Sequence, residues 1–197
     1  EEMQRLQQIV NPTIGILTNI GGAHQENFSS LEEKCIEKLA LFRNSDVIIH
    51  DGDDALIASA VEKTLPSMQK MAWSRTDTDK PLYISSVKTE AKSSTITYCY
   101  QGTEGSYTLP FADEASIENS IHCLAVCLCL QLPSQVIAQH MARLEPVAMR
   151  LEVKEGKNGC TLINDSYNSD IASLDIALDF MARRPERDGR ERVLILS

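Results

Sequence analysis

The 197-residue sequence is 43% hydrophobic and 24% charged, which is typical of a folded protein with a hydrophobic core. Its formal charge of −9 argues against a main role in binding nucleic acid or anionic membranes, although a few basic side chains could still hold a nucleotide. The longest apolar run is too short to span a bilayer and no signal peptide is visible. We therefore expect a cytoplasmic protein without membrane or nucleic acid partners.

In the first half of the chain, helical and strand patterns alternate. Strands are predicted over residues 13–19 and 46–50, and helices over residues 1–9, 31–43 and from 55 to about 65. Pro12 ends the first helix, and Ser30 with Glu33 forms a capping box for the second. Strands and helices that alternate at these lengths predict βαβ units and a parallel sheet.

The pattern changes after Trp73. Three strand-like runs, over residues 82–87, 95–100 and 107–111, predict an antiparallel meander appended to the parallel sheet. Helices are predicted over residues 115–131 and 134–143. A hinge at residues 144–147 then divides the chain into domains 1–146 and 147–197. The second domain is predicted to hold a hairpin (151–155 and 160–164), a helix (170–183) and a buried strand (192–196).

Three of the six cysteines lie in the apolar run of residues 121–130. Cys123 and Cys127 are four residues apart, so they would share one helix face and could bind a metal. No C-x-x-C spacing occurs, however, and the neighbouring residues are Leu, Val and Ala. We therefore expect these cysteines to be small buried hydrophobic side chains in a reducing compartment.

The turn TNIGGAH at residues 18–24 follows a predicted buried strand, which is how α/β enzymes place reactive side chains at the carboxyl edge of a sheet. His24 could bind a divalent cation or accept a proton, or simply hydrogen-bond within its own loop. Lys38 lies at the edge of the apolar stripe of the following helix. Partial burial there would favour some neutral amine, which reacts with carbon dioxide to give a metal-binding carbamate; the alternative is a lysine that extends to solvent.

Other polar residues follow predicted strands or open helices. The aspartates at 51, 53 and 54 crowd one turn, although aspartate is common in turns because it hydrogen-bonds its own backbone. Asn119 is expected either to cap the long apolar helix or to face inward, as a ligand contact or a structural amide. Residues 163–169 offer a carboxylate, amides and an aromatic ring suited to a nucleoside, or an ordinary helix cap. Arg150, just past the hinge, could reach a phosphate or lie solvated at the surface.

Six short motifs follow one another across nearly the whole chain. They are TNIGGAH at 18–24, EK at 37–38, DD at 53–54, ENS at 118–120, MRLE at 149–152 and NDSYN at 164–168. In this order they resemble the Mur ligase family, and most closely its members that add D-alanyl-D-alanine to UDP-N-acetylmuramoyl-tripeptide. The run LDIALDF at 174–180 looks like the form in which the ligase is fused to an alanine racemase.

The resemblance implies an ATP-dependent amide ligase of peptidoglycan synthesis, in which a substrate carboxylate becomes an acyl phosphate and is attacked by the amine of D-alanyl-D-alanine. His24 would be a Mg²⁺ ligand, and Lys38 the catalytic lysine that is carbamylated in many members and helps to hold the metal. Five further residues would bind ATP: Asn119 at the adenine, Arg150 near the hinge, Asp165 at the ribose, and Tyr167 and Asn168 beside the nucleotide.

The chain also departs from the family pattern. No G-x-x-x-x-G-K-[ST] loop for the ATP phosphates occurs, Asp51 stands where Asn is usual, and Asp170-Ile171 replaces the usual Asn-Pro. We therefore expect the latter part of a Mur ligase central ATPase domain, a mostly parallel α/β sheet with an antiparallel appendage, plus the start of an α/β C-terminal domain. Such a fragment would be inactive alone, and its open sheet edge would favour self-association. The alternatives are another Mur ligase, a folylpolyglutamate synthase-like ligase, or a non-catalytic interaction module of this fold.

Overall fold

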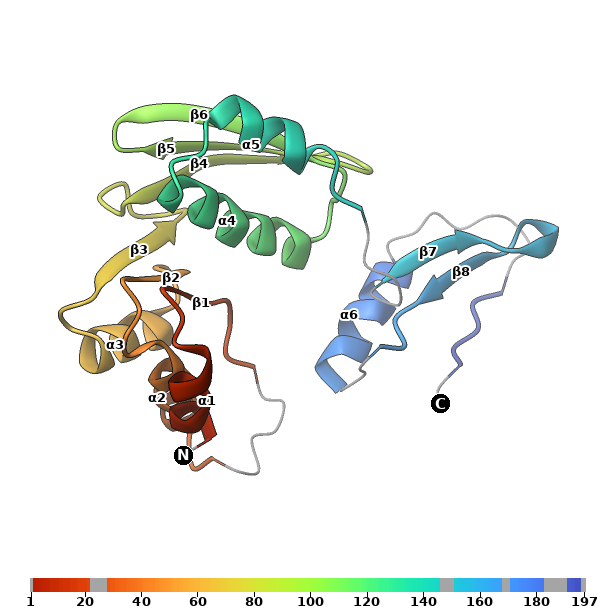
Figure 1. Ribbon diagram of the computed structural model, residues 1–197. Coiled ribbons are helices and arrows are strands. Elements are labelled where there is room, and N and C mark those ends of the chain that lie inside the picture. The colour runs from red at the N-terminus through yellow and green to blue at the C-terminus, as the bar shows by residue number, and fades with distance from the viewer. Residues whose placement is uncertain (1, 22–27, 146–150, 168–170, 183–190, 196–197) are drawn as a thin grey trace. The chain divides into compact units, whose positions relative to one another are not determined.

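The computed structural model describes residues 2–21, 28–145, 151–167, 171–182 and 191–195. Its internal contacts divide the chain into two compact units, Glu1–Leu144 and Glu145–Ser197. The first unit holds a six-stranded sheet with helices on both faces, and the second holds a two-stranded sheet with one helix (Figure 1). Within each unit the order of elements follows the mixed α/β architecture expected from the sequence.

The six strands of the first unit lie side by side in chain order. They are β1 (Ile14–Leu17), β2 (Val47–Asp51), β3 (Gln69–Ser74), β4 (Leu82–Thr89), β5 (Ser94–Tyr100) and β6 (Thr103–Leu109). Strands β1 to β4 pair in parallel, whereas β4, β5 and β6 form an antiparallel meander. The predicted combination of a parallel sheet with an antiparallel appendage is therefore confirmed.

The meander is joined to the parallel strands through a short overlap. Only Trp73 and Ser74 of β3 pair with Leu82 and Tyr83 of β4, so β4 continues past the carboxyl end of β3 (Figure 1). Strand β3 was not predicted, because its apolar residues are confined to its second half. Strand β6 begins at Thr103, four residues before the predicted strand, because pairing with β5 stabilises a polar sequence that has no apolar alternation of its own.

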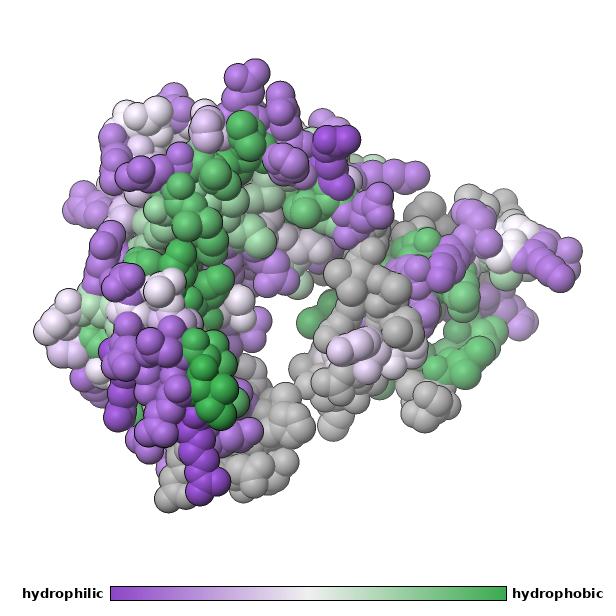
Figure 2. All heavy atoms as spheres, viewed as in Figure 1, coloured by the Kyte–Doolittle hydropathy of each residue, from purple (hydrophilic) through white to green (hydrophobic). Residues whose placement is uncertain are grey.

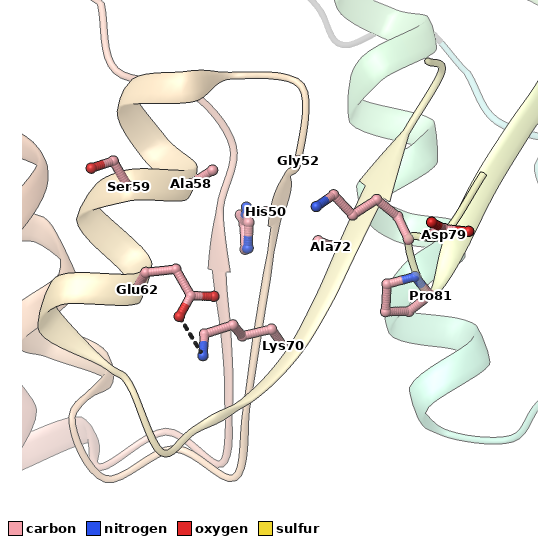
Figure 3. A pocket seen from close by; sticks show the side chains of 10 residues that line it. His50, Gly52, Ala58, Ser59, Glu62, Lys70, Ala72, Asp79 and Pro81 are labelled. Atoms are coloured by element: carbon pink, nitrogen blue, oxygen red, sulfur yellow. Dashed lines mark ion pairs between the residues drawn. The ribbon is translucent and has the colours of Figure 1, made fainter. Parts of the chain in front are cut away.

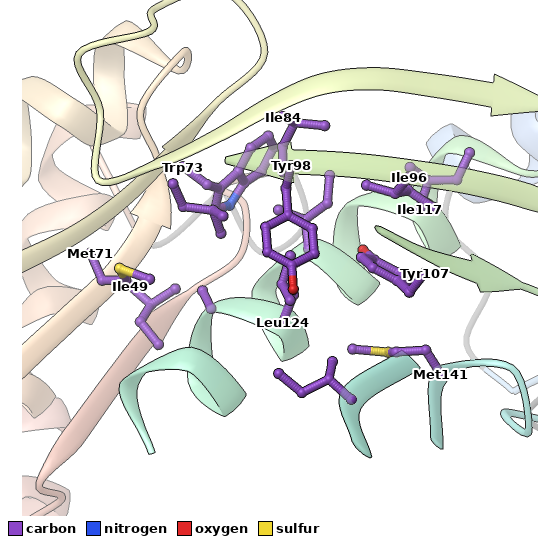
Figure 4. Close-up of a cluster of buried hydrophobic side chains, with 14 of the residues drawn as sticks. Ile49, Met71, Trp73, Ile84, Ile96, Tyr98, Tyr107, Ile117, Leu124 and Met141 are labelled. Atoms are coloured by element: carbon purple, nitrogen blue, oxygen red, sulfur yellow. The ribbon is translucent and has the colours of Figure 1, made fainter. Parts of the chain in front are cut away.

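Helices lie on both faces of the sheet. They are α1 (Glu2–Val10), α2 (Leu31–Leu39) with the 3₁₀ turn η2 (Ala40–Phe42), α3 (Ala55–Thr64), α4 (Glu114–Cys129) and α5 (Ser134–Met141). Helix α5 packs on the antiparallel strand β6, and α1 packs on α2 and η2. Helices α2 and α3 pack with Leu17 and Ile48 on one face. Helix α4 packs with Ile49 and Trp73 on the other face, where the larger core lies (Figure 4). The two faces separate because successive strand residues point to opposite sides of the sheet.

The predicted helix starts are confirmed by side-chain caps. Ser30 accepts the amide of Glu33 at the start of α2, and the Glu33 carboxylate turns back to accept both the amide and the hydroxyl of Ser29. Asp54 caps α3, and Asp113 caps α4. These contacts satisfy N–H groups that the first turn of a helix leaves without a partner.

The expectation for the cysteines of α4 is only partly confirmed. Cys127 and Cys129 are half-buried, but Cys123 is exposed. Because α4 is apolar on most of its surface while one face alone packs on the sheet, composition could not indicate which cysteine would lie outside. No three histidine, cysteine, aspartate or glutamate side chains form a metal-binding group anywhere in the described ranges.

The second unit consists of the strands β7 (Glu152–Glu155) and β8 (Thr161–Asn164) and the helix α6 (Ile171–Ala182). The predicted hairpin is confirmed as an antiparallel pair. The predicted strand over residues 192–196 is wrong for residues 192–195, which have no regular secondary structure and are exposed. An apolar run forms a strand only where a neighbouring strand pairs with its backbone, and Val193, Leu194 and Ile195 have none among the described residues.

Apolar side chains are also exposed on the first unit. Leu6, Ile9 and Val10 of α1 and Ile16 of β1 lie at its surface, where Figure 2 shows green side chains gathered over α1. Within the described part of the chain, no helix combines the length and apolar character needed to cross a membrane.

The core around α4 makes a direct prediction about stability. Leu124 is completely buried, whereas Leu130, just after the same helix, is 57% exposed. We expect Leu124→Ala to lower the free energy of unfolding by about 2–5 kcal/mol, because it removes buried methyl groups and leaves a cavity. Urea denaturation measures this change. The matched variant Leu130→Ala should change it by less than about 1 kcal/mol, and equal losses in both variants would contradict the packing.

Candidate functional site

The carboxyl ends of β1, β2 and β3 meet at one edge of the sheet. The parallel register pairs Leu17 with His50, and Asp51 with Trp73, so the turns that follow the three strands begin close together. In open parallel sheets this edge is where ligands bind. It is the site that the sequence predicted from the turn at residues 18–24.

The turn after β2 is tied to the turn after β3 through Asp53. Its carboxylate accepts the hydroxyl of Ser74 at 2.5 Å, the amide of Arg75 at 2.7 Å and the hydroxyl of Thr76 at 2.7 Å. Burial opposes ionisation, but these three hydrogen bonds outweigh it and hold the pKa of Asp53 below its usual value. Asp53 is therefore a structural clamp between the turns.

A glycine allows the two turns to approach. The amide of Gly52 donates to the carbonyl of Trp73 at 2.7 Å. A side chain at position 52 would place its Cβ 3.0 Å from that carbonyl and 3.3 Å from the Lys80 side chain. The clamp therefore depends on a residue without a side chain at this position.

Charged side chains gather beside the clamp. Arg75 lies over the Trp73 ring, 5.9 Å from its centre, and forms an ion pair with Glu114 at the start of α4. Burial raises the pKa of both Asp51 and Glu118, and neighbouring carboxylates add to the effect at each. The Nε and Nη2 atoms of Arg75 are buried and have no hydrogen-bond partner among the described residues. The edge therefore offers both donors and acceptors to a polar ligand.

A histidine that the sequence analysis did not single out joins three elements of the edge. His122 of α4 accepts the Trp73 indole N–H at Nδ1, with 3.3 Å between the nitrogens, and the two rings meet edge to face. It also hydrogen-bonds to the backbone of Thr18, directly after β1. Since Nδ1 is an acceptor, the proton lies on Nε2 and is donated to the Thr18 carbonyl. Its signal in the sequence was a single histidine inside an apolar helical run.

Burial lowers the pKa of His122 to about 4, with a smaller contribution from His50; the bond to Thr18 acts in the opposite direction. The imidazole is therefore neutral at pH 7, as the indole hydrogen bond requires. A protonated ring would lose its only acceptor and leave the indole N–H unpaired.

The buried lysine of α2 is Lys34, which the sequence analysis also missed. It is 6% exposed, and its ammonium donates to the carbonyl of Gly21 at 2.6 Å. Lys38, one turn later, is exposed, so the partial burial expected for it is absent. Spacing alone could not separate the two lysines, because residues four apart lie on the same side of a helix.

Of the other site residues predicted from the sequence, some lie in one of the two units and some lie outside the residues that the structure describes. His24, Arg150 and Asn168 lie outside the described residues. Asn119 is exposed on α4, beside Glu118. It neither caps the helix, which Asp113 does, nor faces the core, so its amide is accessible to a ligand.

In the second unit, Asp165 follows β8 and accepts the amide of Leu151 at 3.0 Å. Leu151 has a positive φ of 45°, a conformation that this hydrogen bond helps to hold. Tyr167 is 64% exposed. Asp165 therefore has a structural partner already, alongside the ribose contact expected of it.

A pocket of about 460 Å³ lies on the face of the sheet that α3 covers (Figure 3). It is lined by residues of β2, α3, β3 and the turns that follow β2 and β3, among them His50, Glu62, Lys70 and Lys80. Lys70 pairs with Glu62 at 3.2 Å, and Lys80 pairs with Asp77 at 3.3 Å. Both lysines of this pocket are therefore already paired with carboxylates.

The clamp predicts a large effect of one carboxylate that accepts three hydrogen bonds. Asp53→Asn should lower the free energy of unfolding by about 2 kcal/mol, because an amide cannot accept three donors and brings its own N–H groups. Asp79→Asn, an exposed position in the adjacent turn, is the matched control and should change it little. Urea denaturation of both variants at pH 7 makes the comparison. A loss for Asp53→Asn no greater than for the control would contradict the clamp.

The neutral imidazole predicts a pH dependence. The unfolded chain takes up a proton at His122 as the pH falls through about 6.5, but the folded chain does so only near 4. The unfolding free energy should therefore fall with pH in this window, with His122 responsible for about 2 kcal/mol between pH 7 and 5. The measurement is urea denaturation across this range. His122→Gln, which does not titrate, should show a correspondingly smaller slope, and equal slopes would contradict the assignment.

Comparison with known proteins relates this chain to a family of ligases. UDP-N-acetylmuramoyl-tripeptide–D-alanyl-D-alanine ligase of Bacillus subtilis is 26% identical over 180 residues, which are 90% of this chain and 38% of that protein. The ligase of the same name from Borreliella burgdorferi is 26% identical over 179 residues, or 87% of this chain and 36% of its own. The chain thus spans less than half the length of these relatives.

Solved structures share the fold. MurF from Acinetobacter baumannii superposes with a TM-score of 0.79 at 22% identity, over 93% of this chain and 40% of that one. MurF ligase from Thermotoga maritima, in complex with ADP, gives a TM-score of 0.72 at 18% identity, over 92% and 42%. Residues 1–127 match the family model of the Mur ligase middle domain. This match covers more than half of the sequence, and the chain therefore belongs to the Mur ligase family.

Proposed function

We propose that the protein to which this chain belongs is a cytoplasmic ATP-dependent ligase that joins D-alanyl-D-alanine to UDP-N-acetylmuramoyl-tripeptide. ATP would phosphorylate the substrate carboxylate to an acyl phosphate and leave as ADP. The dipeptide amine would then attack the acyl carbon and displace phosphate, which completes the amide bond. The observation that carries the proposal is the family match over residues 1–127, together with relatives of this activity along both units of the chain.

The carboxyl edge supports the nucleotide part of the proposal. Asn119 is exposed on α4 and can exchange hydrogen bonds with an adenine ring. Glu118, the residue before it, interacts electrostatically with both Asp51 and Arg75, which relates this part of α4 to the turns of the edge. Asp165 and Tyr167 of the second unit, with Arg150 and Asn168, are the proposed contacts to the rest of the nucleotide.

The metal part depends on a modification. Mg²⁺ prefers oxygen ligands, and the free amine of Lys38 does not supply one. A carbamate on Lys38 would supply a carboxylate oxygen on a long side chain; because Lys38 is exposed, this proposal rests on the family resemblance and not on burial of the amine. Lys38 and His24 are therefore proposed as the metal-holding pair, with Lys38 in its carbamylated form.

Two alternatives remain open to test. A folylpolyglutamate synthase from L. casei shares the fold at a TM-score of 0.64 and 17% identity, and a ligase for D-glutamate from Christiangramia forsetii is 27% identical over 86% of this chain. Either likeness would be consistent with a ligase that uses an amine acceptor other than D-alanyl-D-alanine. A non-catalytic interaction module of ligase fold is the second alternative.

An acceptor assay on the full-length protein distinguishes these functions. With ATP, Mg²⁺ and UDP-N-acetylmuramoyl-tripeptide, we expect phosphate release that depends on D-alanyl-D-alanine and does not occur with L-alanine or D-glutamate. Asn119→Ala should raise the KM for ATP by roughly tenfold, the equivalent of one lost polar contact. Ser116→Ala, on the same helix, is the control.

Phosphate release with another acceptor, but not with D-alanyl-D-alanine, would contradict the proposed substrate. No phosphate release with any acceptor would favour the interaction module. The isolated 197-residue chain should show no ATP turnover, because it contains no phosphate-binding loop sequence. Light scattering of the same sample tests the expected self-association, and a clean monomer would contradict it. The proposed racemase fusion is tested by the coding sequence downstream of Ser197.

A further inference from the structure

The segment from Thr18 to Gly21 connects β1 to the residues that include His24. It contains no regular secondary structure, and the structure gives it no backbone–backbone hydrogen bond within the described residues. Thr18, Asn19 and Gly21 are exposed, and Ile20 is half-buried. Ile20 packs against the core on the face that α2 and α3 cover, whereas packing and backbone pairing contribute little to holding the other three residues in place.

Two side chains from different helices hold carbonyls at its two ends. His122 of α4, 4% exposed, bonds to the backbone of Thr18, and Lys34 of α2, 6% exposed, donates to the carbonyl of Gly21. Helix α4 packs on one face of the sheet and α2 on the other. The segment is therefore held from both faces.

Each of these side chains costs free energy to bury. A buried ammonium is stabilised only where its N–H groups meet acceptors, and the Gly21 carbonyl at 2.6 Å is one of them. His122 is fixed in one tautomer and one orientation by the Trp73 indole, so its Nε2–H can point in only one direction. The segment is thus held by groups whose own positions are fixed.

We propose that Lys34 and His122 are positioning residues that hold the Thr18–Gly21 segment, which leads from β1 toward His24 in the sequence, at the carboxyl edge of the sheet. The consequence for metal binding rests on the proposed role of His24. The holding of the segment itself does not depend on that role.

Nuclear magnetic resonance of the 197-residue chain tests the proposal. Lys34→Met and His122→Phe remove the donors but keep similar volumes. The backbone order parameters of Asn19, Ile20 and Gly21 should fall from about 0.85 to below about 0.6 in either variant. Lys63→Met and His140→Phe, both at exposed positions, are the matched controls and should leave them unchanged. Lys34→Arg, which keeps a donor, should restore most of the order.

Unchanged order parameters in both Lys34→Met and His122→Phe would overturn the proposal. If a variant does not fold, the ring nitrogen-15 chemical shifts of His122 in the unaltered chain test its role. They show which ring nitrogen carries the proton, and a proton on Nδ1 would be incompatible with the two hydrogen bonds. The carbonyl carbon-13 chemical shift of Gly21 tests the role of Lys34 in the same way, since it should show that this carbonyl accepts a hydrogen bond from a charged donor.

Binding of Mn²⁺ alone, followed by electron paramagnetic resonance, separates this proposal from the proposed function. If His24 helps to bind the metal, Lys34→Met should weaken Mn²⁺ binding roughly tenfold relative to Lys63→Met. A chain that does not bind Mn²⁺ would contradict the metal site while the order parameters still decide the positioning role. A chain that binds Mn²⁺ equally well with and without Lys34, with an ordered segment in both, would contradict the positioning role alone.

Discussion

A buried hydrogen-bond chain runs from the Trp73 indole through the His122 imidazole to the backbone of Thr18, and it connects β3, α4 and the end of β1. Each link constrains the next, because the indole can only donate and the imidazole must then donate from its other nitrogen. These two hydrogen bonds require a neutral imidazole, and burial favours the neutral form because it lowers the pKa of His122. The turns at the carboxyl edge are arranged around it.

The polar groups at this edge divide into two kinds. Asp53, Asp54 and Asp113 are occupied by backbone and hydroxyl donors, so they build the turns and helix starts. Asn119 is exposed on α4, and two buried nitrogens of Arg75 have no hydrogen-bond partner within the described part of the chain. The structural carboxylates hold the geometry of the turns, and Asn119 is left for the proposed contact to a ligand.

Much of the architecture could be predicted from the sequence. Apolar strand runs and capping residues identified β1, β2, α2 and α3, and the polar turns between β-rich runs identified the meander. Strand β3 and the early start of β6 could not be predicted, because they are stabilised by pairing and not by an apolar pattern of their own. The run at residues 192–196 shows the reverse, since its pattern is apolar but residues 192–195 have no pairing partner in the described structure.

The site residues that fall in sequence motifs, such as Asn119 and Asp165, stay predictions, whereas the structure adds residues whose roles are defined by long-range contacts. Lys34 and Lys38 lie on the same side of one helix, and only the three-dimensional position of Gly21 shows which lysine is buried. His122 appeared as one polar residue in an apolar helix, and its two partners, Trp73 on β3 and Thr18 directly after β1, lie far away in the sequence. Asp53 resembled an ordinary turn residue until its contacts with Ser74 and Thr76 were seen.

A crystal structure of the full-length protein with ADP tests most directly where the nucleotide binds. We expect the adenine ring beside α4, within hydrogen-bond distance of the Asn119 amide and close to Asp51 and Arg75. Adenine bound instead in the pocket between α3 and β3, beside His50 and Lys70, would contradict the assignment of the carboxyl edge as the nucleotide site.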